Sequence, residues 1–304
     1  LTTGVVTVAL SGTTITATSL NSLDANSAQS VNAGGVAAMT GAAADINTAY
    51  ASSGITGLGD EAVTLTDTSA SASTLTTLDG NTSGTIDANT ITSLTGSTAE
   101  ITSLTQSTGI TFGTNVGGTI NDVSVSASAL NTLDAAAGGT IDASTLKTLT
   151  GTSAAVQTAF SAVGISGLTF DASSYLAGYT DLLTAFGTDL TAAKSHYFAN
   201  GVSEGRSFDA FDETSYLASH SDLLAAFGTN TDKALIHYLL NGYSEGRAVD
   251  SFDENSYLAS NTSLIGSTTD AAAHYVSTGY AAGLALDTFD ESSYLASNTS
   301  LIGS

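Results

Sequence analysis

Four aspartates recur in pairs at a fixed spacing in the first half of the chain. Asp67 and Asp87 come at the ends of successive strand-like segments, and Asp122 and Asp142 repeat them one sequence unit later. If neighbouring coils of a repeat stack about 4.8 Å apart, carboxylates on adjacent coils can share Ca²⁺, which takes oxygen ligands. Carboxylates a whole repeat apart are too distant to share one ion. The pattern therefore predicts a calcium site at Asp67 and Asp87, with Asp122 and Asp142 as its copy.

A second interpretation of these aspartates needs no ion. Each carboxylate can accept a hydrogen bond from the backbone of the turn that follows it, a common role of Asp in turns. Asn32 stands one repeat before Asp87 and can make the same bond without a charge. That replacement favours turn capping over metal binding.

Four sets of recurring residues within 1–168 have the same 55-residue spacing as these aspartate pairs. One set comprises LNSLD at Leu20–Asp24, LTTLD at Leu75–Asp79 and LNTLD at Leu130–Asp134. Such a fixed period is the signature of a repeat architecture, and it predicts three 55-residue units. The other three sets are Met39–Gly41, Leu94–Gly96 and Leu149–Gly151; Ile46, Ile101 and Val156; and Ile55, Ile110 and Ile165.

Short strand-like and helix-like segments alternate within each of these units. Val63–Thr66 and Thr85–Asp87 have the β-branched alternation of strands. Between them, residues 72–80 carry apolar side chains at helical spacing, and Ser97–Glu100 has the pattern of a helix-capping box. Each unit should thus hold about two strand-plus-helix coils of roughly 25 residues. We expect an α/β solenoid over residues 1–168, with an all-β solenoid as the structural alternative.

Residues 169–304 have a different, helical repeat. Copies start at Phe170, Phe211, Phe252 and Phe289, so that the offsets are 41, 41 and 37, and the last copy is truncated at Ser304. A repeat of this length with helical periodicity predicts αα-hairpins that stack on their neighbours. The two halves define the expected domains, 1–168 and 169–304, and the expected fold class is α/β.

The copy at Phe211–Arg247 shows how each hairpin should form. Asp212 is a natural N-cap, and Phe211 and Tyr216 flank it as a hydrophobic staple. Ser221 should cap a continuation of this helix that ends at Gly228. A second helix should follow Thr231 and stop at Gly242.

Three histidines recur once per helical copy, each directly before a tyrosine: His196, His237 and His274. One interpretation is a row of ligands or a pH-sensitive seam. The other is a packing position between helices in which one ring nitrogen has a hydrogen-bond partner. Glu204-Gly205-Arg206 and Glu245-Gly246-Arg247 should form turns with a local ion pair.

Charge and composition limit the partners of this chain. Its 304 residues carry a formal net charge of −23 with only five Lys and Arg, and both halves are acidic. Such a surface repels nucleic acid and anionic membranes and attracts divalent cations. No Cys is present, which excludes disulfides and thiolate metal sites. No apolar run of about 18 residues occurs, so we expect no membrane insertion.

The repeat phrases resemble those of two kinds of surface protein. The unit FDxxSYLA…DLLxAFG…HYxxNGxSEGR resembles a repeat of large secreted bacterial surface proteins. The 55-residue unit, with its LNTLD, GTIDA and LTG phrases, is similar to repeats of giant cell-surface proteins of marine cyanobacteria. The resemblance implies an exported, very long, surface-associated, non-enzymatic protein. Because the sequence begins without Met and ends inside a repeat, we expect it to be a fragment of a longer protein. The glycine-rich nonapeptide GGxGxDxxx of calcium-binding toxins is absent.

These observations favour a structural function over catalysis. The sequence lacks the GxxxxGK[ST], GxGxxG and HExxH motifs and the EF-hand loop, and GxSxG spacing occurs only within the repeated SEGR phrase, at 201–205 and 242–246. We expect an extracellular structural protein that self-associates, as a segment of a filament, surface layer or giant adhesin. The alternative is a repeat module that binds glycan, such as cell-envelope polysaccharide. Its aromatic candidates are Tyr179, Tyr243 and Tyr280, which lie outside the staple pattern.

Overall fold

The computed structural model describes residues 8–10, 13–266 and 270–298. The chain packs as two compact units. The first contains the residues up to Phe170 together with Tyr197–Ser207, and the second contains Asp171–His196 and the residues from Phe208 onward. The segment Tyr197–Ser207 thus packs with the first unit, although it lies in the half of the sequence that carries the helical repeat. The truncated end at Ser304 lies outside the described residues.

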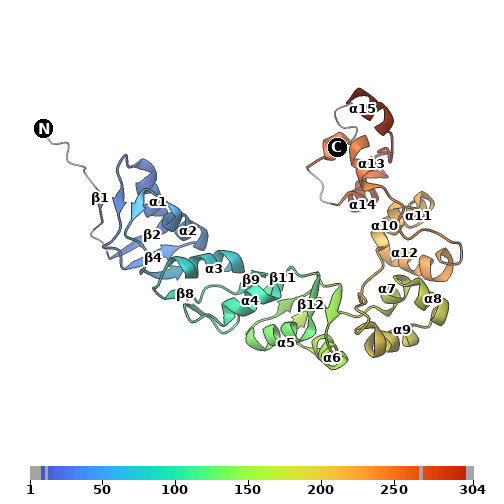
Figure 1. Ribbon diagram of the computed structural model, residues 1–304, viewed down its shortest axis with the longest axis horizontal. Helices are drawn as coiled ribbons and strands as arrows, with labels where there is room; N and C mark the ends of the chain where they lie inside the picture. The colour runs from blue at the N-terminus through green and yellow to red at the C-terminus, as the bar shows by residue number, and fades with distance from the viewer. Residues whose placement is uncertain (1–7, 11–12, 267–269, 299–304) are drawn as a thin grey trace. The chain divides into compact units, whose positions relative to one another are not determined.

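The first unit is a repeating α/β fold in which parallel strands alternate with helices (Figure 1). An all-β arrangement is therefore wrong, because a helix follows every two or three strands. The helices are α1 (Ala17–Asn26), α2 (Ala43–Ala51), α3 (Ala72–Asn81), α4 (Thr98–Thr105), α5 (Ala127–Ala136) and α6 (Ser153–Ser161). The strands are β1 (Val8–Ala9), β2 (Thr14–Thr16), β3 (Val31–Asn32), β4 (Ala38–Gly41), β5 (Ile55–Thr56), β6 (Ala62–Leu65), β7 (Ser69–Ser71), β8 (Ile86–Ala88), β9 (Ser93–Gly96), β10 (Ile110–Phe112), β11 (Gly117–Ile120), β12 (Ser124–Ser126), β13 (Ile141–Asp142), β14 (Thr148–Thr150) and β15 (Ile165–Ser166).

Every described strand pair is parallel and joins residues 23 or 24 positions apart. Met39 lies opposite Val63, for example, and Val63 lies opposite Ile86. Each sheet therefore takes one strand from each successive coil, where a coil comprises two or three consecutive strands, the helix that follows them and the loop up to the next strand. The strand orders are β1-β3-β5, β10-β8-β6-β4-β2, β15-β13-β11-β9-β7 and β12-β14.

Two kinds of coil alternate along the first unit. The shorter coils contain two strands, such as β3 and β4, and the longer coils contain three, such as β5, β6 and β7. The extra length of the longer coil accommodates its third strand. The alternation of shorter and longer intervals can be followed in the helix starts, which are Ala17, Ala43, Ala72, Thr98, Ala127 and Ser153.

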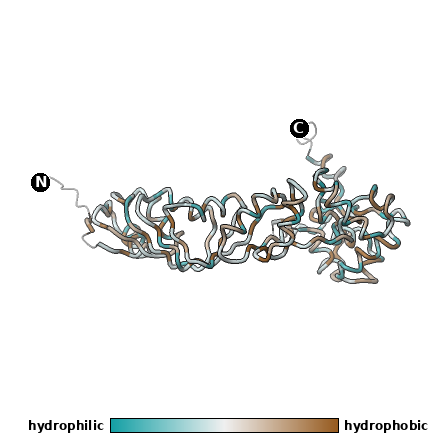
Figure 2. The backbone as a smooth tube through the Cα atoms, turned by 90° about the horizontal axis from the view of Figure 1, so that it is seen from below, coloured by the Kyte–Doolittle hydropathy of each residue, from teal (hydrophilic) through white to brown (hydrophobic). Residues whose placement is uncertain are grey.

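The core of this unit includes several positions of its helices and the strand residues that face them. Met39, Val63 and Ile86 on the strands are at most 1% exposed. Each such side chain contributes about 1.5–3 kcal/mol when removed from water. In Figure 2 apolar segments recur along the backbone tube of this unit. The fourth residue of each of its helices is also at most 1% exposed: Leu20, Ile46, Leu75, Ile101, Leu130 and Val156.

The second unit consists of short helices. The second copy of the helical repeat, which starts at Phe211, has three separate helices. The sequence predicts one helix with a continuation, followed by a second helix. His220, and not Ser221, is the N-cap of α11, and its side chain makes no capping bond. The helices are α7 (Ala172–Ala177), α8 (Thr180–Phe186), α9 (Leu190–His196), α10 (Glu213–Ala218), α11 (Ser221–Phe227), α12 (Thr231–His237), α13 (Glu254–Ser260), α14 (Ala271–His274) and α15 (Glu291–Ser297). The π-helical turns are η1 (Tyr197–Gly201, in the first unit), η2 (Tyr238–Gly242) and η4 (Tyr275–Gly279), and η3 (Thr262–Leu264) is a 3₁₀ helix.

The predicted N-caps and staples of the second unit are present. The carboxylate of Asp212 accepts hydrogen bonds from the backbone of Thr214 and Ser215 at 2.9 Å. The rings of Phe211 and Tyr216 lie 5.5 Å apart, in tilted contact. Asp171, Asp253 and Asp290 cap their helices in the same way.

Candidate functional site

Asp67 and Asp122 bind the backbone of the preceding coil. Asp67 follows β6 and accepts from the backbone of Ala43, the first residue of α2, at 2.7 Å. Asp122 accepts from both the backbone and the hydroxyl of Thr98, the first residue of α4, at 2.6 and 2.7 Å. Each aspartate therefore caps a helix that starts one coil earlier, where the helix dipole favours a negative charge. The alternative interpretation expects each aspartate to cap the turn that follows it, and for Asp67 and Asp122 this expectation is wrong.

Asp87 and Asp142 have a local role. Asp87 accepts from the backbone of Asn89 at 3.0 Å and from its side-chain amide at 2.7 Å. Asp142 accepts from the backbone of Ser144 at 3.0 Å. Asn32 makes the same bond to Gly34. The predicted turn capping is confirmed for these two aspartates.

The strand register does not place the paired aspartates opposite each other. Asp87 lies opposite Thr64, which precedes Asp67 in the chain. Among the described residues no group of three or more His, Cys, Asp or Glu side chains is arranged to hold a metal ion. Calcium binding at Asp67, Asp87, Asp122 and Asp142 stays a prediction.

A further set of aspartates joins neighbouring coils, although sequence reasoning did not assign it a role. The last residue of the LNTLD-like motif reaches the segment that follows the next helix. Asp24 accepts from the hydroxyl of Ser52 at 2.6 Å, and Asp79 accepts from that of Ser107 at 3.0 Å. A Cβ atom on Gly109 would lie 2.1 Å from the Asp79 carboxylate. The available sequence signal was a glycine at one constant spacing after each such aspartate: Gly54 after Asp24, Gly109 after Asp79 and Gly164 after Asp134.

A buried carboxylate, that of Glu61, has partners of a different kind from those of the aspartates described above. Glu61 is fully buried, and its Oε2 accepts from the Tyr50 hydroxyl at 2.8 Å and from the backbone of Gly59 at 2.9 Å. Thr82 donates to the Glu61 carbonyl at 2.8 Å. Burial raises the pKa of Tyr50 above its usual value. The hydrogen bond with Thr82 lowers this pKa, and the Glu61 carboxylate raises it further. These three residues tie α2, β6 and α3 together.

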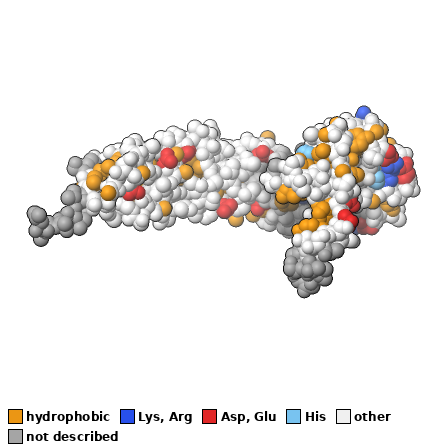
Figure 3. Space-filling model, turned by 90° about the horizontal axis from the view of Figure 1, so that it is seen from above, with side chains coloured by type: hydrophobic (Ala, Val, Ile, Leu, Met, Phe, Trp, Pro, Cys, Tyr) orange, Lys and Arg blue, Asp and Glu red, His pale blue; other side chains and the backbone are white. Residues whose placement is uncertain are grey.

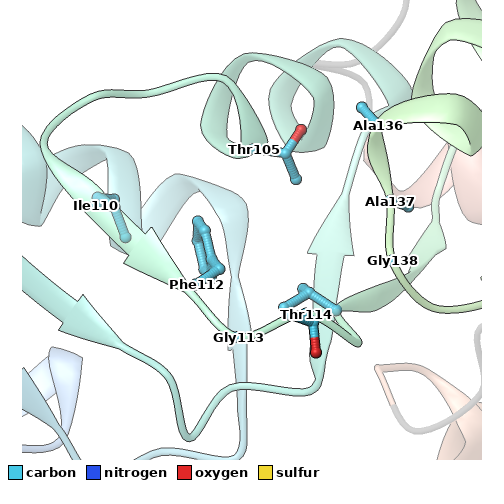
Figure 4. Close-up of a pocket in the computed structure, with 9 residues that line it drawn as sticks. Thr105, Ile110, Phe112, Gly113, Thr114, Ala136, Ala137 and Gly138 are labelled. Carbon is cyan, nitrogen blue, oxygen red and sulfur yellow. The ribbon is translucent and has the colours of Figure 1, made fainter.

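A pocket of about 330 Å³ lies at the corresponding place two coils later (Figure 4). It is open to solvent on one side. Thr105 at the end of α4 and Phe112 in β10 line it, and Figure 4 shows Thr114 beside Phe112 and Ala136 and Ala137 across from them. The Thr105 hydroxyl donates to the carbonyl of Thr102 within its own helix. Its one hydroxyl proton is therefore not available to a group in the pocket.

The three repeating histidines pack against buried tyrosines. Nδ1 of His237 lies 3.0 Å from the hydroxyl of Tyr216, which is fully buried. A Cβ atom on Gly242 would lie 2.3 Å from the same hydroxyl, so only glycine fits there without a shift. The packing interpretation of the histidines is confirmed. The other pairs are His196 with Tyr175 at 2.9 Å and His274 with Tyr257 at 2.8 Å.

The three candidate glycan-binding tyrosines differ in their surroundings. Tyr243 and Tyr280 hold the same position after their π-helical turns and are 36% and 37% exposed. The Tyr243 hydroxyl lies 2.7 Å from that of Thr184 on α8, one copy earlier. Tyr179 instead precedes α8, and its ring lies 5.3 Å from that of Tyr175. The structure therefore does not bring the three rings to one repeated position.

The Glu-Gly-Arg turns form the predicted ion pairs. Arg247 binds Glu245 at 2.6 Å and also Asp222 at 2.8 Å. The bonds from Arg247 hold the pKa of Asp222 below its usual value. Arg206 pairs with Glu204 in the same way. On the face of the second unit that Figure 3 shows, Lys and Arg side chains lie beside acidic ones, whereas the visible face of the α/β unit is mostly uncharged.

Comparison with protein-family models, with curated proteins and with solved structures found no match to this chain. Within the described residues no helix has both the length and the apolar character needed to cross a membrane.

Proposed function

We propose that this chain is a non-enzymatic, extracellular structural protein, a segment of a self-assembling filament, surface layer or giant adhesin. The observation that carries this proposal is the use of its carboxylates. Asp24, Asp67, Asp79 and Asp122 bind hydroxyl or backbone groups of another coil. Side chains of a type that catalyses reactions elsewhere serve here to fix one coil onto the next.

The proposal includes the finer organisation of the fold. Three 55-residue units form a solenoid in which two-strand and three-strand coils alternate. The 41-residue helical copies form αα-hairpin repeats. In both, each copy has too little core to be stable alone and depends on its neighbours. An array of this kind extends by adding copies, which suits a protein that spans distance at a cell surface.

Self-association of such a chain requires cations. With a net charge of −23, two copies repel each other unless the charge is screened or bridged. Calcium, bound by carboxylates such as those of the exposed Asp87 and the half-buried Asp142, is the proposed bridge. Magnesium and sodium would screen the charge without taking the same flexible coordination.

The test is negative-stain electron microscopy of the purified chain with calcium, with chelator, and with sodium chloride at matched ionic strength. We expect ordered fibres or sheets with calcium that disappear with chelator. Equal assembly in sodium chloride would show that screening alone suffices. A chain that stays monomeric at high concentration in several millimolar calcium would overturn self-assembly.

A second candidate function is glycan binding by the helical repeats. The partial exposure of Tyr243 and Tyr280 at corresponding positions favours it, because exposed aromatic rings stack on sugars. We expect envelope polysaccharide to quench tyrosine fluorescence and expect Y243A with Y280A to abolish the quenching. A glycan array without hits and no quenching would reject this function.

A further inference from the structure

The pocket beside Thr105 lies where another coil of the same unit holds an aromatic ring. Tyr50, Thr105 and Phe160 are each the eighth residue of their helices, α2, α4 and α6. The helix end is therefore the same structural position in all three. Tyr and Phe place a six-membered ring there, and Thr does not.

The hydrogen-bond partners of the Tyr50 hydroxyl have also been replaced at the pocket. Glu61 directly precedes β6, and its counterpart directly before β11 is Val116. Thr82 directly follows α3, and its counterpart directly after α5 is Ala137. Val116 and Ala137 both line the pocket. Three lining positions thus correspond to the three members of the Tyr50 network, and each one is smaller or less polar.

The third helix of the series shows what fills this position when no network is present. The ring of Phe160 contacts Phe170, Tyr197 and Phe198, with centroids 6.2, 6.4 and 5.9 Å apart. These are edge-to-face contacts of the kind aromatic side chains favour. An apolar ring therefore occupies this position without needing a hydroxyl partner.

We propose that the pocket beside Thr105 binds a small, neutral aromatic ligand through one phenyl ring. The ring occupies the space that the side chains of Tyr50 and Phe160 fill on their own helices. Its volume of about 330 Å³, part of which is open to solvent, exceeds the volume of about 150 Å³ of an enclosed apolar cavity that holds benzene. Phe112 offers the ligand an aromatic neighbour. At the positions that hold the partners of the Tyr50 hydroxyl, the side chains of Val116 and Ala137 offer no hydrogen bond, so a phenyl ring is favoured over a phenol.

The first test follows fluorobenzene binding to the full chain by ¹⁹F NMR. We expect saturable binding to one site. Thr105→Phe fills the pocket with a ring of its own and should weaken binding at least tenfold. Gln106→Phe adds the same ring at the neighbouring exposed residue and should leave binding unchanged. Failure of the native chain to bind, or equal binding by Thr105→Phe, would overturn the proposal.

Circular dichroism keeps this test independent of misfolding. Filling a cavity with a well-placed ring should leave the melting temperature of Thr105→Phe the same or higher. If that variant fails to fold, Ala137→Leu reduces the same pocket from the opposite wall. Binding unaffected by Ala137→Leu would count against the pocket as the site.

A second test concerns the chemical class of the ligand. Leaving a hydroxyl without a partner in the pocket costs affinity, and we expect toluene to bind about tenfold more tightly than phenol. Tighter binding of phenol would overturn the assignment of an apolar ring.

A gain-of-site variant tests the structural correspondence directly. Tyr50→Thr with Glu61→Val and Thr82→Ala gives the first network the residues of the pocket. We expect the stoichiometry of fluorobenzene binding to rise from one to two. A stoichiometry of one in a folded triple variant would show that these positions do not define the ring site.

Discussion

At the scale of single residues, the polar side chains of the first unit differ in how far along the chain they reach. Asp122 binds α4 of the preceding coil through two bonds, whereas Asp142 binds only within its own turn. A bond that satisfies the free amide groups at a helix N-terminus stabilises more than one within an exposed turn. Substitutions of Asp122 and Asp142 therefore compare a bond between coils with a bond within one turn.

We predict that Asp122→Ala destabilises the first unit by about 1–2 kcal/mol, comparable with the cost of losing an N-cap, because the first amide of α4 loses its acceptor while Ser97 keeps its own capping bond. Asp142→Ala should cost less than about 1 kcal/mol. Asp122→Asn keeps an acceptor and should retain most of the stability. Urea unfolding followed by circular dichroism measures all three. Equal losses for Asp122→Ala and Asp142→Ala would contradict the inter-coil role.

The buried tyrosines make the second unit sensitive to alkaline pH. Burial raises the pKa of Tyr216 to about 12, while Arg247 acts to lower it and Glu245 to raise it. Because the folded-state pKa lies above the unfolded value of about 10, this stabilisation is fully present below pH 10. It is lost as the pH rises towards 12.

We predict that Tyr216→Phe loses less stability than the native chain between about pH 10 and 12, since it removes one titrating group. At neutral pH this variant should be less stable by about 0.5–1.5 kcal/mol, because the bond to His237 is lost. Thermal unfolding across this pH range is the measurement. Tyr294→Phe changes an exposed ring and serves as the control. Identical pH profiles for Tyr216→Phe and the native chain would reject the assignment.

At the scale of elements, local signals were readable from the sequence and inter-coil signals were not. The capping box of Ser97 and Glu100 and the N-cap at Asp212 join residues three or fewer positions apart. Such bonds are fixed by local backbone geometry, so the residue pattern predicts them. The bonds of Asp67 and Asp79 join residues 24 and 28 positions apart. Their partners depend on how coils stack, which no local pattern specifies.

The alternation of two-strand and three-strand coils was also outside the reach of local reasoning. Strand-like runs were expected at Val63–Thr66 and Thr85–Asp87, and β6 and β8 lie there. The short strand β7 reads SAS and has no apolar alternation. It forms because its neighbour β9 offers backbone partners. Sequence period alone therefore indicated two coils per repeat without showing why the coils differ.

We predict that the close approach of two coils at Gly109 tolerates no side chain. A Cβ atom there would lie 2.1 Å from the Asp79 carboxylate, so Gly109→Ala should cost about 1–3 kcal/mol. Gly80, near Asp79 in α3, has no atom within 4 Å of a Cβ position. Gly80→Ala should be neutral or stabilise by about 0.5–1 kcal/mol.

The double variant Asp79→Ala with Gly109→Ala separates the contact from other effects. Removing the carboxylate relieves the clash, so the two substitutions together should cost less than the sum of their separate effects. Urea unfolding of the four chains completes the cycle. Additive costs would mean that Gly109 does not meet Asp79.

At the scale of the whole molecule, the first unit does not end where its sequence repeat ends. The sequence repeat ends near residue 168, but Tyr197–Ser207 packs with this unit. Phe198 lies in η1, and its ring is 5.9 Å from Phe160 and 5.6 Å from Phe170. The last helix of a stacked array has no following coil to cover it, and capping segments meet that need. Because η1 belongs by sequence to a helical copy, composition and period gave no sign of this second role.

We predict from this that Phe198→Ala destabilises α6 specifically. Loss of a partly buried ring that touches two others should cost up to about 3 kcal/mol, and hydrogen exchange of the α6 backbone amides should accelerate accordingly. Leu239 is the second residue of η2, as Phe198 is of η1, and Leu239→Ala should leave α6 protection unchanged. Equal protection of α6 in both variants would mean that the stack is stable without its aromatic cover. Faster exchange in Phe198→Ala alone would make Tyr197–Ser207 a structural part of the α/β array, and shorter fragments that end at residue 168 should then be less stable than the full chain.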